Sequence, residues 1–304
     1  MTITETAYAK INLALHVRRR RDDGYHDLET LFAFVDAGDV LSAAPAAQDS
    51  LHVVGEFSGL LATGLPSLGG GVGGGGSAPS AAEHPHPDPP PPGGGGMFDN
   101  LVARALNALP RPQGLAVTLE KNLPVAAGLG GGSADAGAVF RIVGAMHGLP
   151  DDWRERAARL GADVPACVES ETCIGRGTGT DLMPVENDMA GTPVLLVNPR
   201  IPLATGPVFK AWASTGDGVD RGPLPQGTAS QIALEGRNDL EAPAIALCPA
   251  IADVLAALRA AHPTLARMSG SGATCFALYD STAQRDAARA AIPGDWWTMA
   301  GQLR

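Results

Sequence analysis

The 304-residue sequence lacks the segments that would place a protein in or across a membrane. No apolar run approaches the roughly 20 residues that a spanning helix needs. The first ten residues, MTITETAYAK, have neither the basic start nor the apolar core of a signal peptide. We therefore expect a cytoplasmic protein with no membrane partner.

Cysteine pairs are also missing. Cys167, Cys173, Cys248 and Cys275 form no CxxC pair, so the sequence indicates neither a zinc knuckle nor a redox dithiol. Free cysteine is among the residues most often buried. We therefore expect four reduced, mostly buried thiols.

Basic charge is scarce, because 22 Lys and Arg face 32 Asp and Glu, giving a formal net charge of −10. Nucleic-acid binders usually carry a basic face that releases counterions from phosphates, so we expect no nucleic-acid partner. The one dense basic run, residues 18–21, is typical of a solvated surface loop. Nucleotide binding stays open, because backbone N–H groups can hold phosphates without side-chain charge.

The sequence has enough apolar residues, 45%, for one large domain or two ordinary ones. Residues 7–17 alternate between apolar and polar, which predicts a strand with Lys10 and Asn12 on one side. Apolar runs at 31–35, 40–42, 51–54, 115–119, 194–198 and 275–279, with a last run near 296, predict further strands. Helical spacing is found at 101–109, 133–147, 152–161 and 249–262, and from about 282. This mixture predicts an α+β or α/β fold, with a boundary between two lobes somewhere from 164 to 192.

Residues from about 64 to 96 differ from the rest, since they contain GGGVGGGG and PHPDPPPPGGGG. Such a composition cannot bury enough apolar surface to offset its chain entropy. No lysine follows these glycines and no strand leads into them, so they do not fit a P-loop. The sequence predicts a flexible insertion that hangs free of the nucleotide site.

The strongest local signal for chemistry is the glycine loop at residues 128–133, GLGGGS. Its glycines permit close backbone approach and positive φ. A helix predicted from Ser133 would add free N–H groups and the positive end of its dipole. The loop matches neither Walker A nor a strong Rossmann fingerprint. The pattern favours a phosphate cradle over a plain strand–helix turn. Lys10, Asp163 and the Gly-Ser-Gly at 270–272 are each ordinary when taken singly.

Five segments, taken together and in order, resemble the signature segments of the GHMP kinases. They are AYAKINL (7–13), GYHDLETL (24–31), the glycine loop, GADVP (161–165) and MSGSGAT (268–274). The second and fourth segments are similar to those of one branch of the family. That branch phosphorylates the 2-hydroxyl of a cytidine-diphosphate-linked methylerythritol, in the non-mevalonate isoprenoid pathway.

The resemblance implies two lobes with the site between them. The first, residues 1–166, would be an ATP-binding lobe like ribosomal protein S5, and the second, residues 167–304, would be ferredoxin-like. It implies ATP with Mg²⁺ as the donor and identifies no metal ligand. It further implies that Lys10 and Asp163 are the catalytic pair, with Asp163 accepting the hydroxyl proton.

The resemblance also implies which residues meet the two substrates. Tyr25 and Phe209 would stack on either side of the acceptor's base, and His26 would hydrogen bond to it. The acceptor-binding set is Asn12, Tyr25, His26, Thr205 and Phe209. The ATP-binding set is Asn100, Lys121, Leu123, Pro124, Gly128, Gly130, Gly131, Gly132, Ser133, Gly270, Ser271 and Gly272.

Three positions depart from the usual family pattern: Ala126 and Ala134 in or beside the glycine loop, and Thr180 after Gly179. Two other hypotheses stay open. One is another GHMP kinase, acting on mevalonate, homoserine or a sugar, although Tyr25 and His26 suit a nucleobase better. The other is a non-catalytic module that binds RNA through an S5-like lobe. The protein is expected to be a monomer or a homodimer.

Overall fold

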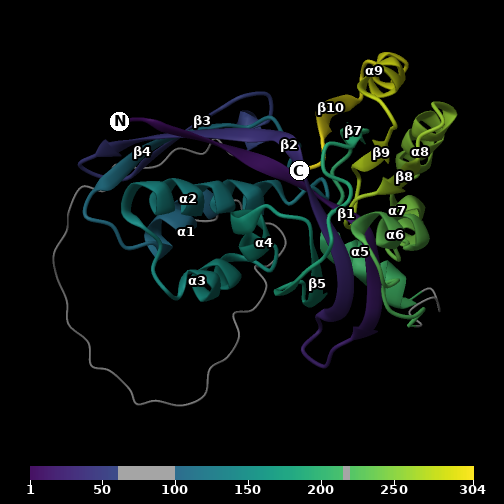
Figure 1. The fold of residues 1–304 in the computed structure, drawn as a ribbon, viewed down its shortest axis with the longest axis horizontal. Helices are drawn as coiled ribbons and strands as arrows, with labels where there is room; N and C mark the ends of the chain where they lie inside the picture. The colour runs from purple at the N-terminus through teal and green to yellow at the C-terminus, as the bar shows by residue number, and fades with distance from the viewer. Residues whose placement is uncertain (61–99, 215–219) are drawn as a thin grey trace.

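The computed structural model describes residues 1–60, 100–214 and 220–304. The insertion predicted at 64–96 lies outside the described residues. Within those ranges the strands form two separate sheets, and helices cover them, which is an α+β arrangement (Figure 1). No helix in the described part of the chain is both long and apolar enough to cross a bilayer.

The first lobe is built on two long strands, β1 (Ile3–Arg20) and β2 (His26–Ala46). They pair antiparallel along most of their length, with three register shifts. The rest of this sheet follows the order β3-β4-β2-β5-β6. Its shorter strands are β3 (Ser50–Val54), β4 (Gly114–Glu120), β5 (Cys173–Gly177) and β6 (Asp181–Pro184). A short 3-10 helix, η1 (Ser58–Leu60), follows β3.

Four helices of the first lobe gather on one side of this sheet (Figure 1). They are α1 (Leu101–Ala108), α2 (Gly131–His147), α3 (Trp153–Leu160) and α4 (Val164–Glu169). Helix α2 packs on β1 and β2 with a buried apolar face that includes Val139, Phe140 and Val143. Gly148 ends the helix with φ +82° and donates its N–H to the Gly144 carbonyl, as the sequence predicts.

The second lobe holds a smaller antiparallel sheet in the order β10-β7-β9-β8. Its strands are β7 (Pro193–Asn198), β8 (Leu265–Met268), β9 (Cys275–Leu278) and β10 (Trp297–Gln302). Its helices are α5 (Thr205–Ser214), α6 (Ala229–Glu235), α7 (Glu241–Leu247), α8 (Ala250–Ala260) and α9 (Thr282–Ala290). All four cysteines are free and buried, as expected.

Strand β1 contributes apolar side chains to three hydrophobic clusters in turn. Ala7 packs in the first-lobe core, Ile11 and Leu13 join a cluster that also holds residues of the second sheet, and Val17 joins the core of the second lobe. The polar side chains of the same strand, including Lys10 and Asn12, are therefore held at the junction of the lobes.

The structure corrects several details of the predicted elements. The strands expected at 31–35 and 40–42 are one continuous strand, β2. Asp39 is buried within β2 because its carboxylate accepts bonds from Lys121 and from the backbone N–H of Asn122 and Leu123. Strands β5 and β6, which follow residue 166, pair within the large sheet; the lobe division at 166/167 stays a prediction.

Arg267 ties the lobes together through buried hydrogen bonds. Its guanidinium donates to the carbonyls of Leu13 in β1, Ala233 (2.8 Å) and Gly236 (2.6 Å). Burial lowers the pKa of this guanidinium to about 10. Three carbonyls from two other segments thus depend on one side chain.

We predict that Arg267→Met destabilises the protein by roughly 3 kcal/mol, because it leaves buried carbonyls without a donor. Urea unfolding midpoints measure the effect. Arg154→Met is the matched control, since the Arg154 side chain is 68% exposed and should change stability by less than about 0.5 kcal/mol. Equal, small effects of the two substitutions would contradict the structural role of Arg267.

Candidate active site

Lys10 and Asp163 form an ion pair at the junction of the lobes. The Lys10 Nζ lies 3.1 Å from Asp163 Oδ2, inside the 4 Å expected of a direct pair, and 3.0 Å from the Asn12 Oδ1. The Lys10 side chain is 5% exposed and that of Asp163 is 32% exposed. The lysine is thus fixed in the protein interior, while the carboxylate opens toward solvent. Asp163 precedes α4, where Pro165 in the first turn suits the start of a helix.

The glycine loop passes directly beneath this pair. Helix α2 begins at Gly131, two residues before the predicted start, and Gly130 is its N-cap with φ +62°. A Cβ at Gly130 would lie 3.0 Å from Lys10 Cε and 3.7 Å from Asp163 Oδ2, so only glycine fits there without strain. The backbone amide of Lys10 donates to the Leu129 carbonyl. The N-terminus of α2, with its free N–H groups, is thereby held against the catalytic candidates.

Ala126, just before this loop, has φ +53°, in the left-handed region that favours glycine. The family resemblance implies glycine at this position, and alanine places a methyl group in a strained backbone conformation. Such a residue costs roughly 1 kcal/mol relative to glycine.

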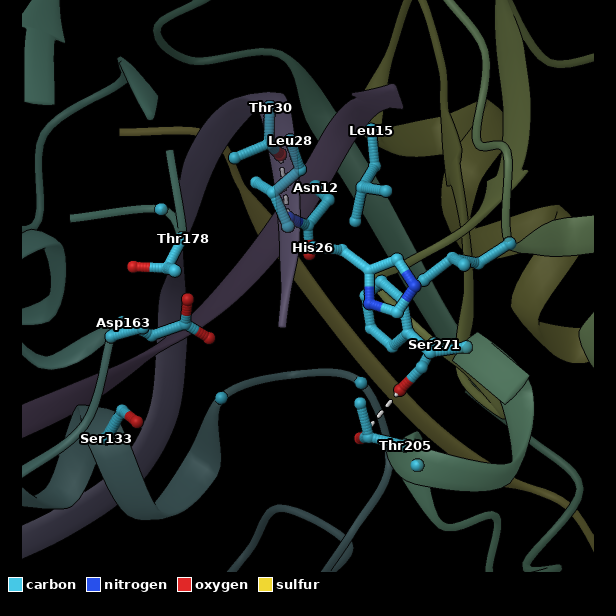
Figure 2. Close-up of a pocket in the computed structure, with 18 of the residues that line it drawn as sticks. Asn12, Leu15, His26, Leu28, Thr30, Ser133, Asp163, Thr178, Thr205 and Ser271 are labelled. Atoms are coloured by element: carbon cyan, nitrogen blue, oxygen red, sulfur yellow. Dashed lines mark hydrogen bonds between the residues drawn. The ribbon is translucent and has the colours of Figure 1, made fainter. Parts of the chain in front are cut away.

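The second lobe closes the site through its Ser-Gly-Ser turn. The Ser269 hydroxyl donates to the Gly128 carbonyl at 2.8 Å and accepts from the backbone N–H of Asn12 at 3.2 Å. A Cβ at Gly128 would lie 2.4 Å from the Ser269 carbonyl oxygen, so the two loops are in direct contact. Ser271 shares a hydrogen bond of 2.9 Å with Thr205 at the start of α5 (Figure 2).

An aromatic group lies on the other side of the cavity. The His26 ring packs against Phe209 of α5 with centroids 4.7 Å apart, and Trp212 meets it edge-on at 5.5 Å. Tyr25 is 42% exposed beside it. Burial, followed by the positive charge of Arg20, lowers the pKa of His26. Its buried Nε2 has no hydrogen-bond partner in the described residues, so it is free to bond a ligand.

These parts surround one cavity of about 900 Å³. Figure 2 shows Asp163 and Ser133 on one side and His26 on the other, with Thr205 and Ser271 below. The predicted site residues that line it are Lys10, Asn12, Tyr25, His26, Gly128, Gly130, Gly131, Gly132, Ser133, Asp163, Thr205, Phe209, Gly270 and Ser271. The predicted ATP-binding residues outside the described lining are Asn100, Lys121, Leu123, Pro124 and Gly272.

The chain is similar to known proteins of one family along nearly all of its length. Family models described as the GHMP kinases N terminal domain and GHMP kinases C terminal match residues 100–171 and 227–296. The 4-diphosphocytidyl-2-C-methyl-D-erythritol kinase of Novosphingobium aromaticivorans is 64% identical over 304 residues, covering 100% of this chain and 94% of the relative. The chain belongs to this kinase family.

Two further relatives extend the match. The kinase of the same name from Erythrobacter litoralis is 64% identical over 306 residues, covering 99% of this chain and 100% of the relative. A crystal structure of a 4-(cytidine 5'-diphospho)-2C-methyl-D-erythritol kinase superposes with a TM-score of 0.75 at 30% identity, covering 99% of both chains. The two-lobed GHMP kinase fold is confirmed. Since GHMP kinases use ATP, the chain is an ATP-dependent small-molecule kinase.

Several lining residues of the kinase were not predicted from its sequence. Thr178 and Gly179 come from the turn after β5, and Lys210 follows Phe209 in α5. Arg20 belongs to the basic run expected in a solvated loop; it is the last residue of β1, is exposed, and also lines the cavity. Its position opposite His26 in the β1–β2 hairpin is set by strand register, which the sequence pattern alone did not reveal.

Lys121 of the kinase lies in a buried ion cluster. Its ammonium bonds Asp39 of β2 and, at 2.7 Å, Asp135 in the first turns of α2, and it is 2% exposed. A Cβ at Gly131 would lie 3.2 Å from Lys121 Nζ, so the ammonium lies under the glycine loop. Asn100 caps α1 by accepting from the Val102 amide. ATP contacts for both residues stay predictions.

Asp135 has an unusual electrostatic environment. Burial raises the pKa of Asp135 to about 7. The Lys121 charge acts against this shift, and the Asp39 charge adds to it. The Asp135 Oδ1 has no hydrogen-bond partner in the described residues. The folded state therefore holds a proton on Asp135 at pH values where the unfolded chain does not.

We predict that the stability difference between wild type and Asp135→Asn depends on pH. A raised folded-state pKa contributes stability at low pH that is lost as pH rises through about 7. Asparagine does not titrate. As pH rises from about 4 to about 7, the free energy of unfolding of the variant should therefore increase relative to that of wild type, by up to a few kcal/mol. Urea unfolding at intervals across this range measures it. Asp181→Asn, at an exposed site, is the control. A pH-independent difference would contradict the prediction.

Proposed function

We propose that the chain transfers the γ-phosphoryl group of ATP to the 2-hydroxyl of 4-diphosphocytidyl-2-C-methyl-D-erythritol, giving the 2-phosphate and ADP in the non-mevalonate isoprenoid pathway. The observation that carries this is the cavity itself. It places the Lys10–Asp163 pair between a glycine-rich helix N-terminus and an aromatic group built on His26 and Phe209. The names of the relatives support the same acceptor.

Catalysis in this proposal depends mainly on positioning and charge. Phosphoryl transfer needs alignment of the two substrates and compensation of charge on the transferring group more than strong base catalysis. Asp163 accepts the proton of the acceptor hydroxyl and aims its oxygen at the γ-phosphorus. Lys10 fixes Asp163 at 3.1 Å and stabilises negative charge on the transferring group. Gly128, Gly130 and the first N–H groups of α2 hold the donor phosphates.

The acceptor's base lies at the aromatic end. Tyr25 and Phe209 stack on cytosine, whose ring offers a π-face to both. The free His26 Nε2 hydrogen bonds to the base edge. A neutral imidazole, favoured by the lowered pKa of His26, can accept at Nε2 from the cytosine amino group. Mevalonate, homoserine and sugars offer no such ring, so this end of the cavity favours the cytidyl acceptor over them.

Mg²⁺ fits the cavity as part of the nucleotide complex. The described residues contain no cluster of three or more acidic, His or Cys side chains, and Asp163 is the acidic side chain in the described lining. Mg²⁺ in kinases is commonly held by one or two carboxylates together with substrate phosphates. Asp163 and the ATP phosphates would hold it, and the metal would neutralise charge on the phosphates.

We further propose a cytoplasmic location, supported by four free, buried cysteines of the kind found in reducing compartments. We propose no nucleic-acid partner, in line with the net charge of −10. We propose a monomer or homodimer, and a division between the lobes after β6 rather than at 166/167, because β5 and β6 pair within the large sheet.

The proposed function predicts ADP release with ATP, Mg²⁺ and the cytidyl acceptor, and none with mevalonate, homoserine or galactose. Asp163→Asn should lower kcat at least about 100-fold, because a positioned proton acceptor contributes roughly that much. ATP affinity, measured by calorimetry without Mg²⁺, should stay within about threefold of wild type, since the loop is intact. Asp181→Asn is the matched control and should keep full activity.

Three outcomes would go against this proposal. If only another acceptor is phosphorylated, the chain is a GHMP kinase with a different substrate and the proposed acceptor is wrong. Near-normal kcat in Asp163→Asn would remove the role of Asp163. Absence of turnover with every acceptor, in a protein that binds ATP, would overturn the cytidyl-methylerythritol assignment.

A further inference from the structure

The cavity has a positive charge imbalance that the catalytic pair does not explain. The charged side chains in its described lining are Lys10, Arg20, Asp163 and Lys210. Lys10 and Asp163 neutralise each other at 3.1 Å. Arg20 and Lys210 remain, with a combined charge of +2, in a protein whose formal net charge is −10. A local excess of one sign inside a cavity attracts and orients a ligand of the opposite sign.

Arg20 stands out from the three other arginines of its basic run. Arg18 pairs with Glu29 at 3.1 Å, Arg19 with Asp27 at 2.6 Å and Arg21 with Asp23 at 3.0 Å. Among the described residues no carboxylate lies within ion-pair distance of Arg20. Its guanidinium is therefore available to a ligand, with a fork of donors that suits phosphate oxygens.

Lys210, like Arg20, lines the cavity without an ion-pair partner among the described residues. It directly follows Phe209, whose ring packs on His26, and it lines the same cavity. No ion pair connects it to a carboxylate in the described ranges. Arg20 approaches the same aromatic group from the opposite strand, because it is the register partner of His26 in the β1–β2 hairpin. One cation is thus the strand neighbour of His26, and the other is the chain neighbour of Phe209.

This position is separate from the phosphate-binding loop. Figure 2 shows His26 across the cavity from Ser133 and Asp163. The Arg20 charge is close enough to His26 to lower the pKa of its imidazole. ATP phosphates at the start of α2 would lie on the other side, so the two cations face a different anion.

We propose that Arg20 and Lys210 form an anion subsite that binds the diphosphate of the acceptor. The inference rests on the proposed function. In the proposed complex the acceptor's base lies between Tyr25 and Phe209, and its hydroxyl lies at Asp163. The diphosphate attached to the cytidine then starts close to the base, in the part of the cavity that these cations line. The subsite would raise affinity for acceptors that carry a diphosphate, and would leave the transfer step itself unchanged.

Steady-state kinetics of Arg20→Gln and Lys210→Gln test the subsite. Each should raise the KM for the cytidyl acceptor about five- to tenfold and leave kcat and the KM for ATP within about twofold, since each removes one charge-assisted contact to the acceptor alone, made by an exposed side chain at the cavity edge. Arg19→Gln removes the same charge from the neighbouring position, where the side chain is 75% exposed and paired with Asp27. This control should behave like wild type.

Competitive inhibition separates the diphosphate from the base. Cytidine 5'-diphosphate should inhibit Arg20→Gln about five- to tenfold less strongly than wild type, while inhibition by cytidine should be unchanged. Added salt should weaken inhibition by cytidine 5'-diphosphate less in the variants than in wild type. Equal losses for cytidine and its diphosphate, or a KM rise no larger than in Arg19→Gln, would overturn the subsite.

The same experiment distinguishes failure of the subsite from failure of the proposed function. If wild type does not phosphorylate the cytidyl acceptor, the proposed function fails. The subsite is then judged by calorimetric binding of cytidine 5'-diphosphate and cytidine to wild type, Arg20→Gln and Arg19→Gln. A diphosphate-specific loss in Arg20→Gln alone supports it, and its absence overturns it.

Discussion

The burial of the Lys10 ammonium is the constraint around which the site is organised. An ammonium taken out of water must be met by an opposite charge and by hydrogen-bond acceptors. Asn12 from the same strand and Asp163 from the start of α4 meet this need. The Lys10 amide adds a bond to Leu129 in the glycine loop. One buried charge thereby draws a strand, a loop and a helix N-terminus to a single point.

The two lobes depend on each other because β1 belongs to both. Its apolar residues pack first in the core of one lobe and then in that of the other. Arg267 of the second lobe donates to the β1 carbonyl of Leu13, and the Ser269 hydroxyl joins Asn12 to Gly128. The glycine loop and the Ser-Gly-Ser turn therefore cannot separate without breaking buried hydrogen bonds. A site between lobes gains fixed geometry from this arrangement.

Local pattern predicted much of this structure. Alternation at 7–17 identified β1 and placed Lys10 beside Asn12, and the spacing of apolar residues identified α1, α2 and α8. Pattern failed where tertiary contacts override local preference. Asp39 has the character of a turn residue, yet it remains inside β2 because Lys121, more than 80 residues away in sequence, binds its carboxylate. Helix α4 is only six residues long, too short for a periodic signal.

The candidate site divides in the same way. Glycines at 128 and 130 could be singled out because a glycine-rich loop permits positive φ, whereas Gly270 was identified only through the family resemblance. The family resemblance implies that Lys121 borders the adenosine, and this stays a prediction. Its buried contacts with two carboxylates depend on tertiary structure and have no local signal. Arg20 is exposed, as expected of a basic run, but its place in the cavity lining was not predicted. Which arginine of the run lacks an ion-pair partner among the described residues depends on the carboxylates that the fold brings near, and that is a property of strand register.

Charge in this kinase acts on two length scales. Over the whole surface the protein is acidic, with a net charge of −10, which should repel nucleotides and phosphate esters at long range. Screening limits that repulsion to about 8 Å at physiological ionic strength. In the cavity lining the balance reverses, through the helix dipole and backbone N–H groups at α2 and through two exposed cations near His26 that have no ion pair among the described residues. Low-dielectric walls strengthen these local fields, so an acidic protein can bind two anionic substrates in one cavity without a basic exterior.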